Sequence, residues 1–258
     1  MQKDASWCLT MANLLEVDSL RVKYGEYEAV KGVSFTLGEG EIVGIVGQSG
    51  SGKSTIAKAL MGLESIARGT VNRADVSMQM VFQDAVGSLN PRMTIRQTLT
   101  EVLRYGKGIP RRDERIDDRI SRLLGYVGLS AAVLDQYPRE MSGGQCQRVS
   151  IARALAFEPR ILVADEPVSA LDVSVQARVL NLLRALKDEL GLSILLIAHD
   201  LAVVKNVCDR VYVMQKGAFV DEGPSEKVFC SPSSEYTKNL LLAVPDVDRA
   251  LRSRRQSK

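Results

Sequence analysis

A run of nine residues combines glycines, hydroxyl groups and one lysine at a spacing that suits phosphate binding. The run consists of Gly47, Gln48, Ser49, Gly50, Ser51, Gly52, Lys53, Ser54 and Thr55. Its glycines let successive backbone N–H groups turn toward one anion. The helix expected over residues 54–60 points the positive end of its dipole at the same place. Lys53 is then placed to contact the outer phosphates of a nucleotide, and the Ser54 hydroxyl to bind Mg²⁺. A chance glycine loop explains the run poorly, because a strand predicted over residues 41–46 leads directly into it.

Two neighbouring carboxylates follow the buried strand predicted over residues 161–164. Asp165 ends this strand, where it can hold Mg²⁺ through water. Glu166 is expected to point the other way along the pleat, where it can orient and deprotonate an attacking water. Acidic pairs at strand ends are often no more than the start of a solvated loop. The phosphate-binding run nevertheless makes a hydrolytic role the better interpretation.

A second glycine pair begins another helix, which we expect to continue through Ala156. Ser142 suits the N-cap, and Gly143 and Gly144 expose N–H groups at the helix start, with Gln145 next in the chain. This second anion cradle has no lysine and no metal ligand of its own. A plain capped helix would be the default if these residues stood alone. One complete and one partial phosphate site in the same chain instead predict a head-to-tail pair, in which each partial site closes over the nucleotide of the other chain.

The elements that must position these residues alternate between strands and helices. Segments rich in Val and Ile cover residues 14–22, 30–37, 41–46, 76–82, 161–164, 194–198 and 211–214. This order predicts an α/β fold with a mainly parallel sheet covered on both faces. The opening strands have no helix between them, which predicts an antiparallel flank. Apolar residues at helical spacing predict a helix over 174–190. The stretch of about 90–158 shows several helices and no strand, so we expect a helical insertion there.

The 258 residues are best explained by one domain with an insertion. We place the domain at 14–245, its core at 14–89 and 159–245, the helical insertion at about 90–158, and tails at 1–13 and 246–258. The net charge of +3 and the aromatic share of 5% are too low to favour a nucleic-acid partner. The apolar runs are far shorter than the ~20 residues of a membrane-spanning helix. With no secretory pattern at the start, the chain is expected to stay inside the cell and to meet a membrane only through partners.

These motifs occur in the order typical of the ABC ATPase family, and the chain resembles that family over about residues 14–245. Residues 142–145 match the family's signature, with Met141 where Leu is usual. The resemblance adds four candidate residues: Tyr24 as the aromatic that stacks on adenine, Gln83 as the Q-loop residue, Asp172 in the D-loop, and His199, the only histidine, as the sensor of the γ-phosphate.

The resemblance implies a phosphate-loop, RecA-like fold with ATP and Mg²⁺ as cofactors. It implies catalysis by Glu166 with His199 and Gln83, and metal binding by Ser54, Gln83 and Asp165. It also implies partners: membrane-spanning permease subunits, a second ABC ATPase subunit that is identical or related, and indirectly a substrate-binding protein. The expected location is peripheral, on the cytoplasmic face of the cell membrane.

A finer resemblance concerns the importer branch for oligopeptides, dipeptides and nickel. Residues 81–95, 165–176 and 231–245 are similar to that branch. The segment from Gln83 to Thr94 is expected to form the groove that receives a short helix of the membrane partner, with Phe82, Leu89 and Arg92 as contact candidates.

Two alternatives remain at this point. A soluble ABC ATPase of DNA repair or translation would carry tandem domains or long coiled coils. A GTPase or small-molecule kinase would leave residues 142–145 unexplained. The sequence itself leaves the cargo open, together with the choice between a homodimer and a heterodimer of ATPase subunits.

Overall fold

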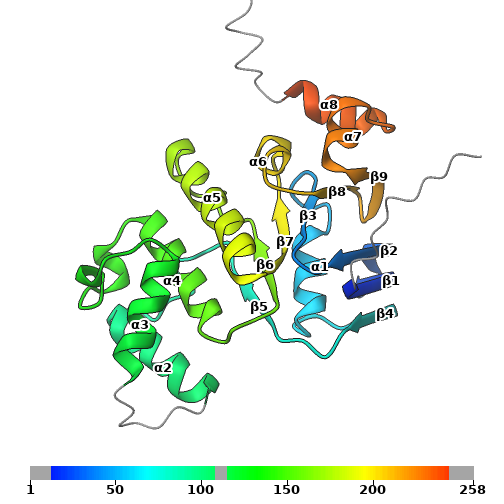
Figure 1. Cartoon of the computed structure of the whole chain (residues 1–258). Coiled ribbons are helices and arrows are strands. Elements are labelled where there is room, and N and C mark those ends of the chain that lie inside the picture. The colour runs from blue at the N-terminus through cyan, green and yellow to red at the C-terminus, as the bar shows by residue number, and fades with distance from the viewer. Residues whose placement is uncertain (1–12, 108–114, 244–258) are drawn as a thin grey trace, which may run out of the picture.

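The computed structural model describes residues 13–107 and 115–243 of the chain (Figure 1). The strands are β1 (Asn13–Tyr24), β2 (Tyr27–Gly38), β3 (Ile42–Val46), β4 (Arg68–Arg73), β5 (Met78–Val81), β6 (Ile161–Asp165), β7 (Ser193–Ala198), β8 (Arg210–Gln215) and β9 (Ala218–Pro224). The helices are α1 (Lys53–Leu60), α2 (Ile95–Lys107), α3 (Arg115–Tyr126), α4 (Gly143–Leu155), α5 (Val173–Leu190), α6 (Leu201–Lys205), α7 (Ser225–Cys230) and α8 (Glu235–Ala243), with 3₁₀ turns at Ala131–Val133 and Pro138–Glu140.

A six-stranded sheet in the order β5-β6-β7-β3-β8-β9 forms the centre of the molecule. All its neighbouring strands pair in parallel except β8 and β9, which are antiparallel. Its inner strands are buried on both faces because successive side chains point to opposite sides. In β3, Ile42 and Val46 face one apolar cluster, while Val43 and Ile45 face the other. The same alternation runs through β6, β7 and β8.

Each face of the central sheet is covered by different elements. Helices α2 to α6 contribute to the cluster on one face. Helix α1 and the three-stranded antiparallel sheet β2-β1-β4 cover the other, with α1 in contact with strands of both sheets. Figure 1 places the α2–α4 helices and the β1, β2 and β4 strands on opposite sides of β6 and β7. The prediction of an α/β fold with a mainly parallel core and an antiparallel flank is confirmed.

Two strands, β4 and β9, were not expected from the sequence. Both lie at the edge of their sheets, where polar residues and proline are common. The β4 strand begins and ends with arginine, and β9 contains Asp221, Glu222 and Pro224. Edge strands lack the apolar run or clean alternation that identifies a buried strand in a sequence.

The helices α2, α3 and α4 come between β5 and β6 in the chain and pack on one another. Their apolar faces meet through residues such as Leu99, Leu103, Ile120 and Leu124, which are all nearly fully buried. The described part of residues 90–158 contains no strand. The exact division into a core at 14–89 and 159–245 and an insertion remains our prediction.

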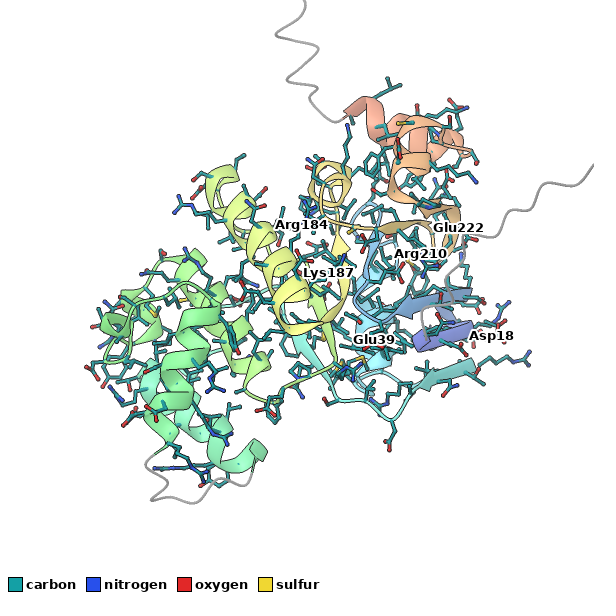
Figure 2. The ribbon with its side chains drawn as sticks, in the orientation of Figure 1. Asp18, Glu39, Arg184, Lys187, Arg210 and Glu222 are labelled. Carbon is teal, nitrogen blue, oxygen red and sulfur yellow. The ribbon has the colours of Figure 1, made fainter. Side chains whose placement is uncertain are left out.

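Ion pairs hold the amino ends of the central strands. Lys187 on α5 lies 3.0 Å from the Asp209 carboxylate, and Arg160 pairs with Glu39. Figure 2 labels Glu39, Lys187 and Arg210, with Glu39 and Lys187 near the middle of the view and Arg210 farther from the α2–α4 helices. The guanidinium of Arg210 also donates to the Thr36 carbonyl oxygen at 2.8 Å, which ties β8 to β2. Because these contacts lie at the amino ends, the opposite ends of the strands are left for the site described next.

Candidate active site at the carboxyl ends of the central strands

Four neighbouring strands bring the candidate residues to one edge of the sheet. The phosphate-binding loop, residues 47–52, follows β3, and Asp165 ends β6. Gln83 follows β5, and His199 directly follows β7. Since β5, β6, β7 and β3 are adjacent and parallel, their carboxyl ends share one edge. In parallel α/β sheets this edge is where ligands bind.

The Lys53 ammonium lies at the centre of the loop. Its Nζ donates to the carbonyl oxygens of Gly47 at 2.8 Å and of Gln48 at 3.0 Å. The side chain is only 3% exposed. Burial lowers the pKa of Lys53, and the carboxylates of Glu166 and Asp165 act in the opposite direction. A buried ammonium that donates to two backbone carbonyls suits the binding of a polyanion.

The start of α1 is open toward the same place. Gly52 is the N-cap with φ 108°, and no side chain caps the helix. The buried Ser51 Oγ has no hydrogen-bond partner among the described residues. Uncapped N–H groups at a helix start, together with this unpaired hydroxyl, are the donors that a phosphate group would satisfy. The residues present therefore fit the nucleotide implied by the sequence.

The outer side of the loop is supported by segments that the sequence analysis missed. The Gly217 N–H donates to the Ser51 carbonyl oxygen at 2.9 Å. A Cβ atom on Gly47 would lie 2.1 Å from the Met214 carbonyl oxygen, and one on Gly52 would lie 2.5 Å from the Ala29 carbonyl oxygen. These two positions therefore require glycine for packing as well as for phosphate contact. Gly217, which follows the strand predicted over residues 211–214, was the turn signal in the sequence that could have indicated this support.

The hydroxyl and carboxylate expected to bind metal are in contact. Ser54 Oγ donates to Asp165 Oδ1 at 2.9 Å. Burial raises the pKa of the Asp165 carboxyl, and the Ser54 hydrogen bond lowers it in part. Hydroxyl and carboxylate oxygens are the ligands that Mg²⁺ prefers, so the pair fits this cation.

The Glu166 side chain lies in the site, in contact with Gln83, Lys53 and His199. The strand ends at Asp165, and Glu166 takes a left-handed conformation with φ 45°. Its Oε2 accepts from Gln83 Nε2 at 3.2 Å, and its Oε1 lies 3.8 Å from Lys53 Nζ. His199 Nδ1 lies 3.6 Å from the same Oε2. The left-handed turn thus makes Glu166 the meeting point of the side chains that follow β5, β7 and the phosphate-binding loop.

Tyr24 lies at the end of β1, close to Thr55 in the first turn of α1. Burial raises the pKa of the Tyr24 phenol, while its side-chain hydrogen bonds with Thr55 and Glu64 act in opposite directions. The ring is 44% exposed. A partly exposed aromatic ring beside Thr55 is suitably placed to stack on a base whose phosphates lie in the loop.

The second anion cradle is built as a capped helix start. Ser142 Oγ accepts from the Gln145 N–H, and Gln145 Oε1 accepts from the Ser142 N–H at 2.9 Å. A Cβ atom on Gly144 would lie 2.4 Å from Val175 Cγ1, so α4 and α5 approach closely here. Asp172 caps α5 by accepting from the Val175 N–H at 3.0 Å. The signature and D-loop residues are therefore neighbours.

A groove of ≈ 350 Å³ separates this second group from the segment after β5. Its lining consists of Gln83, Asp84, Ala85, Val86, Gly143, Gln147, Pro167, Ser169, Ala170 and Leu171. Gln83 lines this groove and also donates a hydrogen bond to the Glu166 carboxylate in the nucleotide site. A change at the Glu166 carboxylate can therefore reach the wall of the groove through one side chain.

The segment after Gln83 is attached to α4. The Arg153 guanidinium donates to the Ser88 carbonyl oxygen at 2.5 Å, and Ser88 Oγ lies 3.2 Å from Ser150 Oγ. Phe82 is 38% exposed, as expected of a contact residue, but Leu89 is only 2% exposed and belongs to the apolar core. Leu89 is therefore unsuitable as a docking contact.

Comparisons with known proteins agree with this geometry. A family model described as ABC transporter matches residues 30–169. The oligopeptide transport ATP-binding protein OppF of Salmonella typhimurium is 46% identical over 266 residues, covering 91% of this chain and 78% of the relative. Among the described residues, no helix combines the length and the apolar character needed to cross a membrane.

Two solved structures are similar over most of the chain. One is cbiO1 from Clostridium perfringens, part of the ABC transporter complex cbiONQ, with a TM-score of 0.77, 26% identity and coverage of 93% of this chain and 99% of that chain. The other is the dimeric ATP-binding cassette MJ0796 bound to ADP and Pi, in a post-hydrolysis state. It has a TM-score of 0.72, 29% identity and coverage of 82% and 98% of the two chains.

Proposed function

This chain belongs to the ABC transporter family, and from that premise we propose that it is the ATP-hydrolysing subunit of an importer for oligopeptides. The observation that carries the proposal is the convergence of Lys53, Ser54, Asp165 and Glu166 at one edge of the sheet. The peptide cargo follows from the name of the OppF relative and replaces the choice between peptide and nickel that the sequence left open.

ATP is the substrate that suits the site. Its adenine would stack on Tyr24, and its phosphates would lie in the cradle of residues 47–55, with Lys53 on the outer phosphates. Mg²⁺ would be held by Ser54 and Asp165, with Gln83 beside them. When bound, this ion neutralises developing charge on the phosphate oxygens.

Glu166 is the general base in this proposal. Its carboxylate accepts a proton from water as the water oxygen attacks the γ-phosphorus, and ADP leaves with the electrons of the broken P–O bond. Gln83 and His199 orient the carboxylate, since both lie within 3.6 Å of Glu166 Oε2. The hydrogen bond from the Gln83 amide keeps the carboxylate oriented toward the attacking water.

The second cradle acts on another chain. Residues 142–145 carry no cation and no metal ligand, and together with Asp172 they would close over the nucleotide of a second ATPase subunit. The dimeric state of the MJ0796 cassette supports this arrangement. The second subunit in this proposal is either a copy of this chain or a related ATPase subunit.

The transport function requires partners at a membrane. Permease subunits would dock beside the exposed residues Phe82, Val86 and Arg92, and a substrate-binding protein would deliver peptide to the permease. The subunit would then lie on the cytoplasmic face of the membrane as a peripheral protein. The cbiO1 relative, part of a transporter complex, supports this assignment. A soluble ABC ATPase of DNA repair or translation is not favoured, because the OppF relative is a transport protein.

The test is ATP-driven peptide uptake by vesicles that contain the complex purified with this chain. We expect uptake of labelled oligopeptides that requires ATP and disappears with Lys53→Ala. A complex that hydrolyses ATP but takes up no peptide would disprove the cargo. A Lys53→Ala chain that binds ATP like the wild type would disprove the nucleotide site.

A further inference from the structure

A hydrogen bond joins helix α8 to the phosphate-binding loop. The backbone N–H of Gln48 donates to the Tyr236 hydroxyl at 3.1 Å, across 188 residues of sequence. Tyr236 is the second residue of α8 and packs, partly buried, against the apolar cluster to which helices α2 to α6 contribute. Tyr236 was not among the residues from which the site was predicted.

The same peptide unit is held at its other end by Lys53. The Gln48 N–H and the Gly47 carbonyl are parts of one peptide group, and in a planar trans peptide they point in opposite directions. The Gly47 carbonyl oxygen accepts from Lys53 Nζ at 2.8 Å. The orientation of this peptide at the start of the loop is therefore set by the lysine ammonium on one side and the tyrosine hydroxyl on the other.

The position of Tyr236 is itself fixed by the fold. The Asp221 carboxylate of β9 is buried, and its Oδ2 accepts from the N–H groups of Ser233 at 2.8 Å and of Ser234 at 3.1 Å. Ser234 Oγ then accepts from the Tyr236 N–H at 3.2 Å. Thr237, the next residue, is fully buried. Asp221 thus anchors the turn that starts α8 and places the phenol beside the loop.

We infer that Tyr236 is a positioning residue that keeps the Gly47–Gln48 peptide oriented when nucleotide binds; this inference rests on the nucleotide site proposed above. The Lys53 ammonium has three N–H donors, and two of them go to the Gly47 and Gln48 carbonyls in the free protein. Sharing this ammonium with bound phosphates weakens its hold on the Gly47–Gln48 peptide, whereas the hydrogen bond to the Tyr236 hydroxyl is unaffected by the sharing. Loss of its hydroxyl therefore costs little in the free protein, where Lys53 still holds the peptide, and more in the nucleotide complex.

Tyr236→Phe tests the inference, because it removes the hydroxyl and leaves the ring that packs on the core. A neutral hydrogen bond corresponds to a factor of about 3 to 10 in an equilibrium constant. We therefore expect the ATP affinity to fall, and the KM for ATP to rise, by about that factor. The kcat should stay within about twofold, because no group at Glu166 changes. The thermal midpoint without nucleotide should stay close to that of the wild type.

The matched control is Tyr126→Phe, which makes the same change in another partly buried tyrosine, at the end of α3. Its ATP affinity should equal that of the wild type. Tyr236→Ala removes the ring as well and is expected to lower the thermal midpoint in addition to ATP affinity.

Two results would overturn the inference. One is a Tyr236→Phe chain with wild-type ATP affinity, which would make the tyrosine a packing residue only. The other is a parallel loss of kcat, ATP affinity and thermal midpoint, which would indicate a general disturbance of the fold. Lys53→Ala, measured in the same series, separates the two proposals: if it lacks ATP binding while Tyr236→Phe binds normally, the nucleotide site stands and only the role of Tyr236 is wrong.

Discussion

Replacing Glu166 by glutamine separates proton transfer from every other role of this side chain. The amide keeps an oxygen that can accept from Gln83 Nε2, which lies 3.2 Å from Glu166 Oε2 in the unchanged chain. What disappears is the negative charge and the ability to take a proton from water. Removal of a general base lowers a rate by about 10²- to 10⁴-fold, which corresponds to about 3 to 5 kcal/mol on the activation barrier.

Nucleotide binding should survive the same change. The Glu166 carboxylate lies 3.8 Å from Lys53 Nζ, but the ammonium is held at shorter distances by the Gly47 and Gln48 carbonyls. Neutralising a carboxylate beside the phosphates also removes a like-charge repulsion. We therefore expect ATP affinity equal to or tighter than that of the wild type, and a closed pair of subunits that accumulates with ATP.

The assay is phosphate release at saturating ATP, run beside equilibrium ATP binding and gel filtration with ATP. Glu189→Gln is the control, because it removes an exposed carboxylate from α5 by the same chemical change and should leave turnover intact. Turnover of Glu166→Gln within about threefold of the wild type would refute the reasoning, and His199, whose Nδ1 lies 3.6 Å from the carboxylate, would become the candidate base.

Three further predictions follow from the same geometry. Lys53→Ala should lower ATP affinity by at least about tenfold, since a charge-assisted contact is lost; calorimetric titration checks this, and unchanged affinity would contradict it. Phe82→Ala should reduce peptide uptake by reconstituted vesicles far more than basal hydrolysis by the isolated subunit, and a parallel fall of both would exclude a coupling role. Burial raises the pKa of the Cys146 and Cys208 thiols, so iodoacetamide at pH 8 should label exposed Cys230 before these two cysteines; mass spectrometry that found Cys208 labelled in the native protein would show that the β8 region opens.

Local patterns in the sequence determined the chemistry of this protein. The glycines, lysine and serine of residues 47–55 act through neighbouring backbone groups, so their spacing alone predicts a phosphate cradle. The inner strands were equally predictable, because apolar runs in parallel strands buried on both faces leave a direct trace in the sequence. Edge strands β4 and β9 left no such trace.

The tertiary structure decided how distant residues meet. The order β5-β6-β7-β3 brings Gln83, Asp165 and His199 to one edge, and a left-handed φ at Glu166 turns its carboxylate toward them. The Leu89 side chain faces the core because of how the α2–α4 helices pack. The Tyr236 hydroxyl reaches the loop only because Asp221 anchors α8. Such contacts depend on the relative placement of elements far apart in the chain, which no local spacing of residues encodes.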